Sequence, residues 1–188
     1  MTRIRLLAGG LLVASLGSSA GAEPAAVAPL LKPLDLRGYP SGTMPPAFSG
    51  PTLEARRVSL GDLRGKVLLV NFWASWCLEC RPEMPMLERL HRELGPRGLA
   101  VVGVNAREDR DAVRRYARDL DLTFALVLDL DGKINAAYGV VAVPTTFVVG
   151  RDGRAVALAI GPRDWASPAA RAILDALLAE SPSRPDGR

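Results

Sequence analysis

The chain has 188 residues, of which 48% are hydrophobic and 23% charged, so it is long enough to bury a core and too apolar for wholesale disorder. Its 24 basic and 20 acidic residues leave a net charge of +4, which does not by itself indicate nucleic-acid binding. The single histidine excludes sites built from several imidazoles, and the two cysteines exclude a disulfide-rich scaffold and a four-cysteine zinc site.

The N-terminus has the pattern of an export signal. Arg3 and Arg5 precede an apolar run over 6–16, and Ala20-Gly21-Ala22 fits the small-x-small rule for cleavage after Ala22. The alternative is an uncleaved membrane anchor over 1–22, although this stretch is at the short limit for a span and is interrupted by glycine and serine. In both cases we expect the folded part in the periplasm or otherwise outside the cytoplasm, where disulfide bonds persist.

The residues that follow are expected to form a linker. Six of the 24 residues at 23–46 are proline, which removes backbone donors and favours an extended, semi-stiff tether. We assign a single domain to 47–180 and a flexible tail to 181–188, which contains two prolines and a glycine.

Within the domain, apolar runs alternate with helical patterns. Strands are expected at 56–60, 67–74, 99–104, 124–128, 145–149 and 155–160, and helices at 78–94, 112–120, 134–138 and from Ser167-Pro168 onward. Pro85 is expected to kink the first of these helices. Connections of this length predict parallel strands with right-handed crossovers, and the turn at 150–153 predicts a closing antiparallel hairpin. The chain is therefore expected to form an α/β fold, with a mixed central sheet and helices on both faces.

Both cysteines lie where the first buried strand passes into a helix. Cys77 is predicted at the helix N-terminus, where free N–H groups and the helix dipole favour an exposed thiolate, and Cys80 one turn further on and more deeply buried. A zinc half-site, a structural disulfide and two ordinary core cysteines are the alternatives. We favour a redox dithiol because zinc would lack two ligands, and a disulfide closing so short a loop would contribute only about 2 kcal/mol.

The residues around this pair resemble a known family. Trp76-Cys77-Leu78-Glu79-Cys80 with Pro85 is similar to the active site of thioredoxin-fold proteins. The stretches 63–77 and 81–85 and the motif Val143-Pro144-Thr145-Thr146-Phe147 resemble the TlpA/ResA/CcmG-like branch of exported thiol-disulfide oxidoreductases. The resemblance implies a thioredoxin fold with the extra strand-helix insertion of that branch, no cofactor and no metal, and a role in cytochrome c maturation or oxidase assembly.

The resemblance also implies roles for single residues. Val143–Pro144 would be a cis peptide bond facing Cys77, the Val143 backbone would hold an extended peptide as an added strand, and Trp76 would wall the site. Three further residues depart from or complete the pattern.

Glu108 matches a glutamate that the branch places after the next strand. A buried carboxyl there would exchange a proton with Cys80, and the alternative is an ordinary helix-capping acid. Asn71 stands where cytosolic thioredoxin carries a buried aspartate. Glu79 replaces the proline usual in the branch, and we expect it to tune the redox poise together with Arg81.

These observations favour an extracytoplasmic reductase of protein disulfides. Cys77 would attack the target disulfide and Cys80 would resolve the mixed disulfide. The partners would be a protein substrate, such as an apocytochrome c or a copper-site protein, and a membrane thiol donor, with a membrane tether if 1–22 is retained. The alternatives are the reverse reaction in a disulfide oxidase or isomerase, and a Cu(I)-handling module. A thiol peroxidase is a weaker option.

Overall fold

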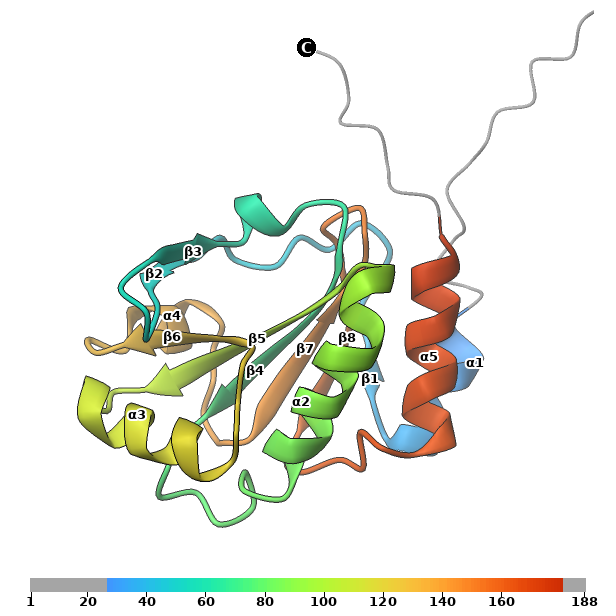
Figure 1. Ribbon diagram of the computed structural model, residues 1–188. Coiled ribbons are helices and arrows are strands. Elements are labelled where there is room, and N and C mark those ends of the chain that lie inside the picture. The colour runs from blue at the N-terminus through green and yellow to red at the C-terminus, as the bar shows by residue number, and fades with distance from the viewer. Residues whose placement is uncertain (1–26, 181–188) are drawn as a thin grey trace, which may run out of the picture.

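The computed structural model describes residues 27–180, which fold around one six-stranded sheet (Figure 1). The strand order is β1-β8-β7-β4-β5-β6. The strands are β1 (Arg37–Gly38), β4 (Val67–Trp73), β5 (Leu99–Ala106), β6 (Ala125–Asp129), β7 (Thr145–Val149) and β8 (Ala155–Ile160). β4, β5 and β6 are parallel, β7 is antiparallel to β4, and β7 and β8 form the predicted antiparallel hairpin.

A second, two-stranded sheet lies outside the main one. β2 (Ser49–Pro51) pairs with β3 (Arg57–Ser59), so the strand expected at 56–60 exists but does not join the central sheet. A bridge between Thr52 and Val127 and a hydrogen bond from Leu53 N–H to the Leu126 carbonyl attach this hairpin to β6. The free edge of β6 is thereby partly covered.

Helices cover both faces of the sheet, as predicted. They are α1 (Ala28–Leu31), α2 (Glu83–Leu94), α3 (Arg110–Asp119), α4 (Lys133–Ala137) and α5 (Pro168–Ala179), with 3-10 turns η2 (Lys32–Leu34), η3 (Gly61–Leu63) and η4 (Gly95–Arg97). The helices α2 and α3 connect the parallel neighbours β4, β5 and β6 in that order. Because both connections are right-handed and run in the same direction across the sheet, α2 and α3 lie on the same face. α1 and α5 pack on that face too. α4 and the β2–β3 hairpin lie against the other face.

The central strand β4 is buried on both faces, as its continuous apolar sequence predicts. Leu69 and Trp73 belong to the core beneath α2 and α5, whereas Val70 and Phe72 belong to the core beneath α4. Its carboxyl end, which carries the cysteine motif, is therefore held rigidly from both sides.

α2 begins later than predicted, and this changes the role of its proline. Turns fill the chain up to residue 82, and Pro85 is the third residue of the helix. N–H groups of the first turn have no acceptor within a helix. Pro85 therefore removes no helical hydrogen bond, and the premise of the predicted kink is wrong.

The linker predicted over 23–46 is wrong from residue 27 to residue 38. Leu31, Leu34 and Leu36 are buried in the core with α5, and β1 pairs with β8. Two of the prolines that suggested an extended tether, Pro29 and Pro33, stand in the first turns of α1 and η2, where a missing N–H costs nothing. The segments predicted as signal (1–22) and tail (181–188) lie outside the described residues.

No helix within residues 27–180 combines the length and apolar composition needed to cross a membrane.

Candidate active site

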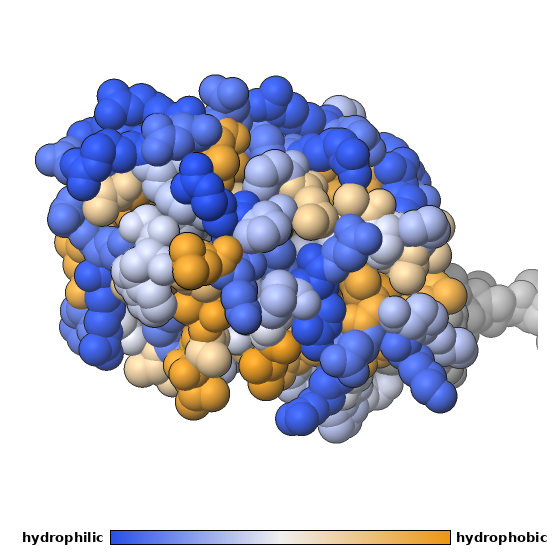
Figure 2. Space-filling view, turned by 90° about the horizontal axis from the view of Figure 1, so that it is seen from below, coloured by the Kyte–Doolittle hydropathy of each residue, from blue (hydrophilic) through white to orange (hydrophobic). Residues whose placement is uncertain are grey.

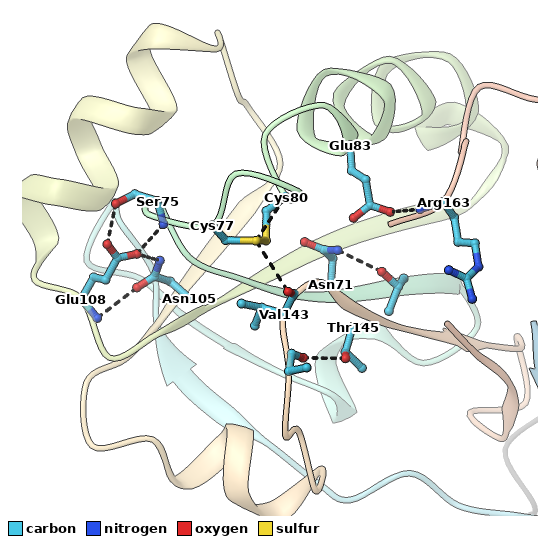
Figure 3. Close-up of a disulfide and its surroundings, with 12 residues drawn as sticks. Asn71, Ser75, Cys77, Cys80, Glu83, Asn105, Glu108, Val143, Thr145 and Arg163 are labelled. Carbon is cyan, nitrogen blue, oxygen red and sulfur yellow. Dashed lines mark hydrogen bonds between the residues drawn. A yellow bond between two sulfur atoms is a disulfide. The ribbon is translucent and has the colours of Figure 1, made fainter. Parts of the chain in front are cut away.

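Three segments meet at the carboxyl end of β4. Residues 74–80 follow β4, and residues 107–109 follow its parallel neighbour β5. Because β7 is antiparallel to β4, residues 142–144, which precede β7, reach the same end of the sheet. Figure 3 shows the side chains that converge there.

Cys77 and Cys80 form a disulfide in this structure, with their Cα atoms 5.3 Å apart. Cys80 is 1% exposed and Cys77 6%, so the order of burial is as predicted, but Cys77 is less exposed than expected. Cys77 also lies in the turns before α2 and not at the helix N-terminus. The backbone group that reaches its sulfur is the Cys80 N–H, at 3.0 Å.

The Val143–Pro144 peptide bond is cis, as the family resemblance implied. The Val143 carbonyl oxygen lies 3.6 Å from the Cys77 sulfur. Within residues 27–180, neither the N–H nor the carbonyl of Val143 has a backbone hydrogen-bond partner. An extended peptide would find a free donor and a free acceptor directly beside the disulfide.

Exposed apolar side chains surround the disulfide. Trp76 is 67% exposed, Leu78 87% and Val141 92%. Figure 2 looks onto this end of the molecule and shows several hydrophobic patches with hydrophilic side chains between and around them. Large apolar groups left in water next to a reactive group are typical of a surface that binds another molecule.

Glu108 holds the loop that precedes Cys77. Its carboxylate accepts hydrogen bonds from the Ser75 N–H (2.7 Å), the Ser75 hydroxyl and the Asn105 side chain (2.7 Å) (Figure 3). The α3 N-cap is Asp109, so the helix-cap alternative is wrong for Glu108. None of its hydrogen bonds reaches Cys80, so this geometry favours a positioning role over the predicted proton exchange with that cysteine, which it does not test.

Asn71 is a neutral polar residue in the middle of the buried strand β4. It is fully buried, and its side-chain N–H donates to the Thr146 hydroxyl on β7 at 2.9 Å. At the place where cytosolic thioredoxin carries an aspartate, this chain therefore has a neutral cross-strand hydrogen bond.

The buried carboxyl at this site belongs to Glu83, which the sequence analysis missed. Glu83 is 1% exposed, begins α2 one turn after Cys80, and points inward in Figure 3. One carboxylate oxygen accepts from the Arg163 N–H (2.7 Å) and the Trp165 indole N–H (2.8 Å), and the other has no hydrogen-bond partner within residues 27–180. Burial raises the pKa of Glu83 to about 7, against the lowering effect of these two hydrogen bonds.

Glu79 and Arg81, predicted to tune the cysteines, are both exposed. The Arg81 guanidinium lies 5.6 Å from the centre of the Tyr116 ring, a cation–π distance. Glu79 makes no hydrogen bond or ion pair with any described residue. Their effect on the redox poise remains a prediction.

Comparisons with known proteins agree with this geometry. The AhpC/TSA family matches residues 41–159. The thioredoxin-like protein YneN of Bacillus subtilis (strain 168) is 44% identical over 119 residues, which cover 62% of this chain and 69% of that protein. The thiol-disulfide oxidoreductase ResA of Bacillus thuringiensis subsp. konkukian (strain 97-27) is 33% identical, over 61% of this chain and 66% of that protein.

A solved structure shares the fold. A Chlorobium tepidum protein named as a thiol:disulfide interchange protein DsbE has a TM-score of 0.68 and 28% identity, and the match covers 73% of this chain and 97% of that chain. The chain therefore belongs to the AhpC/TSA family, as a thioredoxin-like thiol-disulfide oxidoreductase of the ResA and DsbE type that carries a Cys-x-x-Cys pair at residues 77 and 80.

Proposed function

We propose that this protein reduces disulfide bonds in polypeptides outside the cytoplasm, with Cys77 as the attacking thiolate and Cys80 as the resolving thiol. The observation that carries the proposal is the contact between the Cys77 sulfur and the Val143 carbonyl, whose peptide group is free to bind an extended chain. A substrate strand held there has its own disulfide over Cys77, while Cys80 stays shielded.

The reaction proceeds by two exchanges. The Cys77 thiolate bonds to one sulfur of the substrate disulfide, and the other substrate sulfur leaves as a thiolate that takes up a proton. Cys80 then loses its proton and attacks the Cys77 sulfur. The Cys77–Cys80 disulfide forms as the mixed disulfide breaks, and the second substrate sulfur leaves as a thiolate that takes up a proton, so that the substrate carries two thiols.

Acidic groups around the pair support the reducing direction. A thiolate that is strongly stabilised makes a protein oxidising, because it favours the reduced form. Here Glu79 lies between the cysteines in sequence and the buried Glu83 follows Cys80, and negative charge at both positions opposes a thiolate. A Glu83 pKa near 7 also suits a group that exchanges protons with Cys80 at neutral pH.

The location and partners rest on the sequence. The export pattern of residues 1–22 supports an extracytoplasmic site, with a protein substrate such as an apocytochrome c or a copper-site protein, and a membrane thiol donor that returns the pair to the dithiol state. No cofactor takes part in these exchanges.

Trapping the mixed disulfide tests the proposal. Cys80→Ser, expressed in the native compartment, should accumulate covalent complexes that disappear on reduction, because no resolving thiol remains. The matched variant Cys77→Ser should accumulate none, since Cys80 is 1% exposed. Equal trapping by both variants, or trapping by Cys77→Ser alone, would overturn the assigned order of attack. Mass spectrometry of the complexes identifies the substrate.

A further inference from the structure

A pocket of about 320 Å³ opens beside the disulfide. Trp76, which precedes Cys77, and Val143, whose carbonyl faces the Cys77 sulfur, both line it. Val140 and Val141 add further apolar surface. A polypeptide bound along Val143 therefore passes the mouth of this pocket within a few residues of the cysteine that Cys77 attacks.

Among the described residues, Arg107 is the one charged residue that lines the pocket. It directly follows β5 with a positive φ of 62°, and its guanidinium lies over Gly132, where the Cβ of any other residue would overlap it. The space that holds Arg107 is thus created by a glycine. Within residues 27–180 Arg107 makes no hydrogen bond or ion pair.

The neighbouring acid does not neutralise Arg107. Glu108 is committed to Ser75 and Asn105 behind the cysteine loop. The pocket consequently offers a cation with free donors next to apolar walls. A guanidinium matches a carboxylate with two parallel hydrogen bonds, which gives it a preference for aspartate or glutamate over neutral side chains.

We propose that this pocket is a specificity subsite for an acidic side chain of the substrate polypeptide, with Arg107 pairing with the carboxylate and the valines contacting the adjoining chain. The inference rests on the proposed reduction of polypeptide disulfides and names the kind of polypeptide preferred. Val143 both lines the pocket and faces the Cys77 sulfur, and an extended chain advances about 3.3 Å per residue, so the acidic residue is expected within about three residues of the attacked cysteine.

The test compares disulfide-cyclised peptides that differ only by Glu or Gln, placed in turn at each of the three residues on either side of the attacked cysteine. The pre-reduced protein is mixed with each peptide, and the rate constant is followed by tryptophan fluorescence. At one or more positions the Glu peptide should react about threefold faster than its Gln partner, the size expected for an exposed ion pair. The preference should disappear in about 1 M salt, where such pairs are screened.

Variants assign this preference to the pocket. Arg107→Gln should bring the Glu-to-Gln ratio to about one, and Arg107→Lys should keep part of it, because lysine retains the charge without the planar fork. Arg118→Gln, the matched control at the far end of α3, should keep the full ratio. A ratio that survives Arg107→Gln, or a wild-type ratio of one at every position, would overturn the subsite and leave the proposed reduction standing. If the wild-type protein reduces neither peptide, the proposed function fails and the subsite with it.

Discussion

At the scale of single residues, Glu83 makes the stability of the fold depend on pH. Its pKa rises from about 4.5 to about 7 on folding, chiefly through burial, so the folded protein binds this proton more tightly than the unfolded chain. The resulting stabilisation is fully present below about pH 4.5 and is lost as the pH rises through about 7. The difference corresponds to about 3 kcal/mol of unfolding free energy.

Glu83→Gln should remove this dependence. The amide keeps the shape of the side chain but cannot ionise, so the unfolding free energy of the oxidised protein should change much less between about pH 5 and about pH 8 than in the wild type. Urea denaturation across that range measures it. Glu93→Gln, the same change at an exposed site of α2, is the control and should follow the wild type. Parallel curves for Glu83→Gln and the wild type would contradict a raised pKa.

Glu108 is expected to act by positioning the cysteine loop. Glu108→Ala leaves the Ser75 N–H and hydroxyl and the Asn105 amide without their acceptor, which should lower the unfolding free energy by about 1–3 kcal/mol. The Ser75 amide should also exchange its hydrogen faster. The pH dependence of Cys77 alkylation should stay unchanged, and Asp111→Asn, at an exposed acid nearby, should alter neither measurement. A shifted alkylation profile would instead favour proton exchange with the cysteines.

Glu83 and Glu108 show which residues of the site the sequence could reveal. The cysteine pair was predictable because its spacing is local, and Glu108 because it stands at a family position. Glu83 was missed although it lies four residues before Leu87, on the apolar stripe of α2. A charged residue on such a stripe signals burial, but its partners, Arg163 and Trp165, are about 80 residues away and come together only in the fold.

At the scale of elements, the segment from α1 to β1 is part of the core. Leu34 is 6% exposed, so Leu34→Ala should leave a cavity and lower the unfolding free energy by about 2–4 kcal/mol. Leu130→Ala, at a side chain 60% exposed, should change it by less than about 0.5 kcal/mol. Urea denaturation of both variants measures the difference, and equal small effects would mean that the segment is not docked in solution.

The docking of this segment in the core could not be predicted from sequence patterns. Strand and helix positions in 67–179 follow from apolar periodicity, and most agree with the structure to within a few residues. The segment was misread because its prolines suit an extended chain and a helix start equally well. Which of the two forms depends on α5, which lies more than 130 residues further along the chain and supplies the apolar surface that buries Leu31 and Leu34.

At the scale of the whole molecule, the redox direction is linked to global stability. Folding and disulfide formation share one thermodynamic cycle. If the disulfide stabilises the folded protein, the reduction potential of the folded protein becomes more negative, by about 30 mV for each 1.4 kcal/mol of stabilisation. For a reductase, we expect the oxidised form to resist urea better than the reduced form. The potential, measured against glutathione, should be more negative than about −200 mV.

The cysteine-free variant Cys77→Ser/Cys80→Ser controls this measurement, since its unfolding should not respond to reductant. The proposed direction would be reversed if the reduced form resists urea better than the oxidised form and the reduction potential is about −120 mV, the value of a strong oxidant.

The coverage of the sheet edges determines how this protein meets other polypeptides. β8 is paired with β1, which is only two residues long, and residues 52–53 bind to β6 from the β2–β3 hairpin. The molecule thus offers unfolded chains little edge on which to aggregate. The free peptide group at Val143 is different, because it lies beside the disulfide. A fold protected in this way suits the proposed reaction with unfolded polypeptides, because it offers them a free peptide group directly beside the reactive cysteine pair.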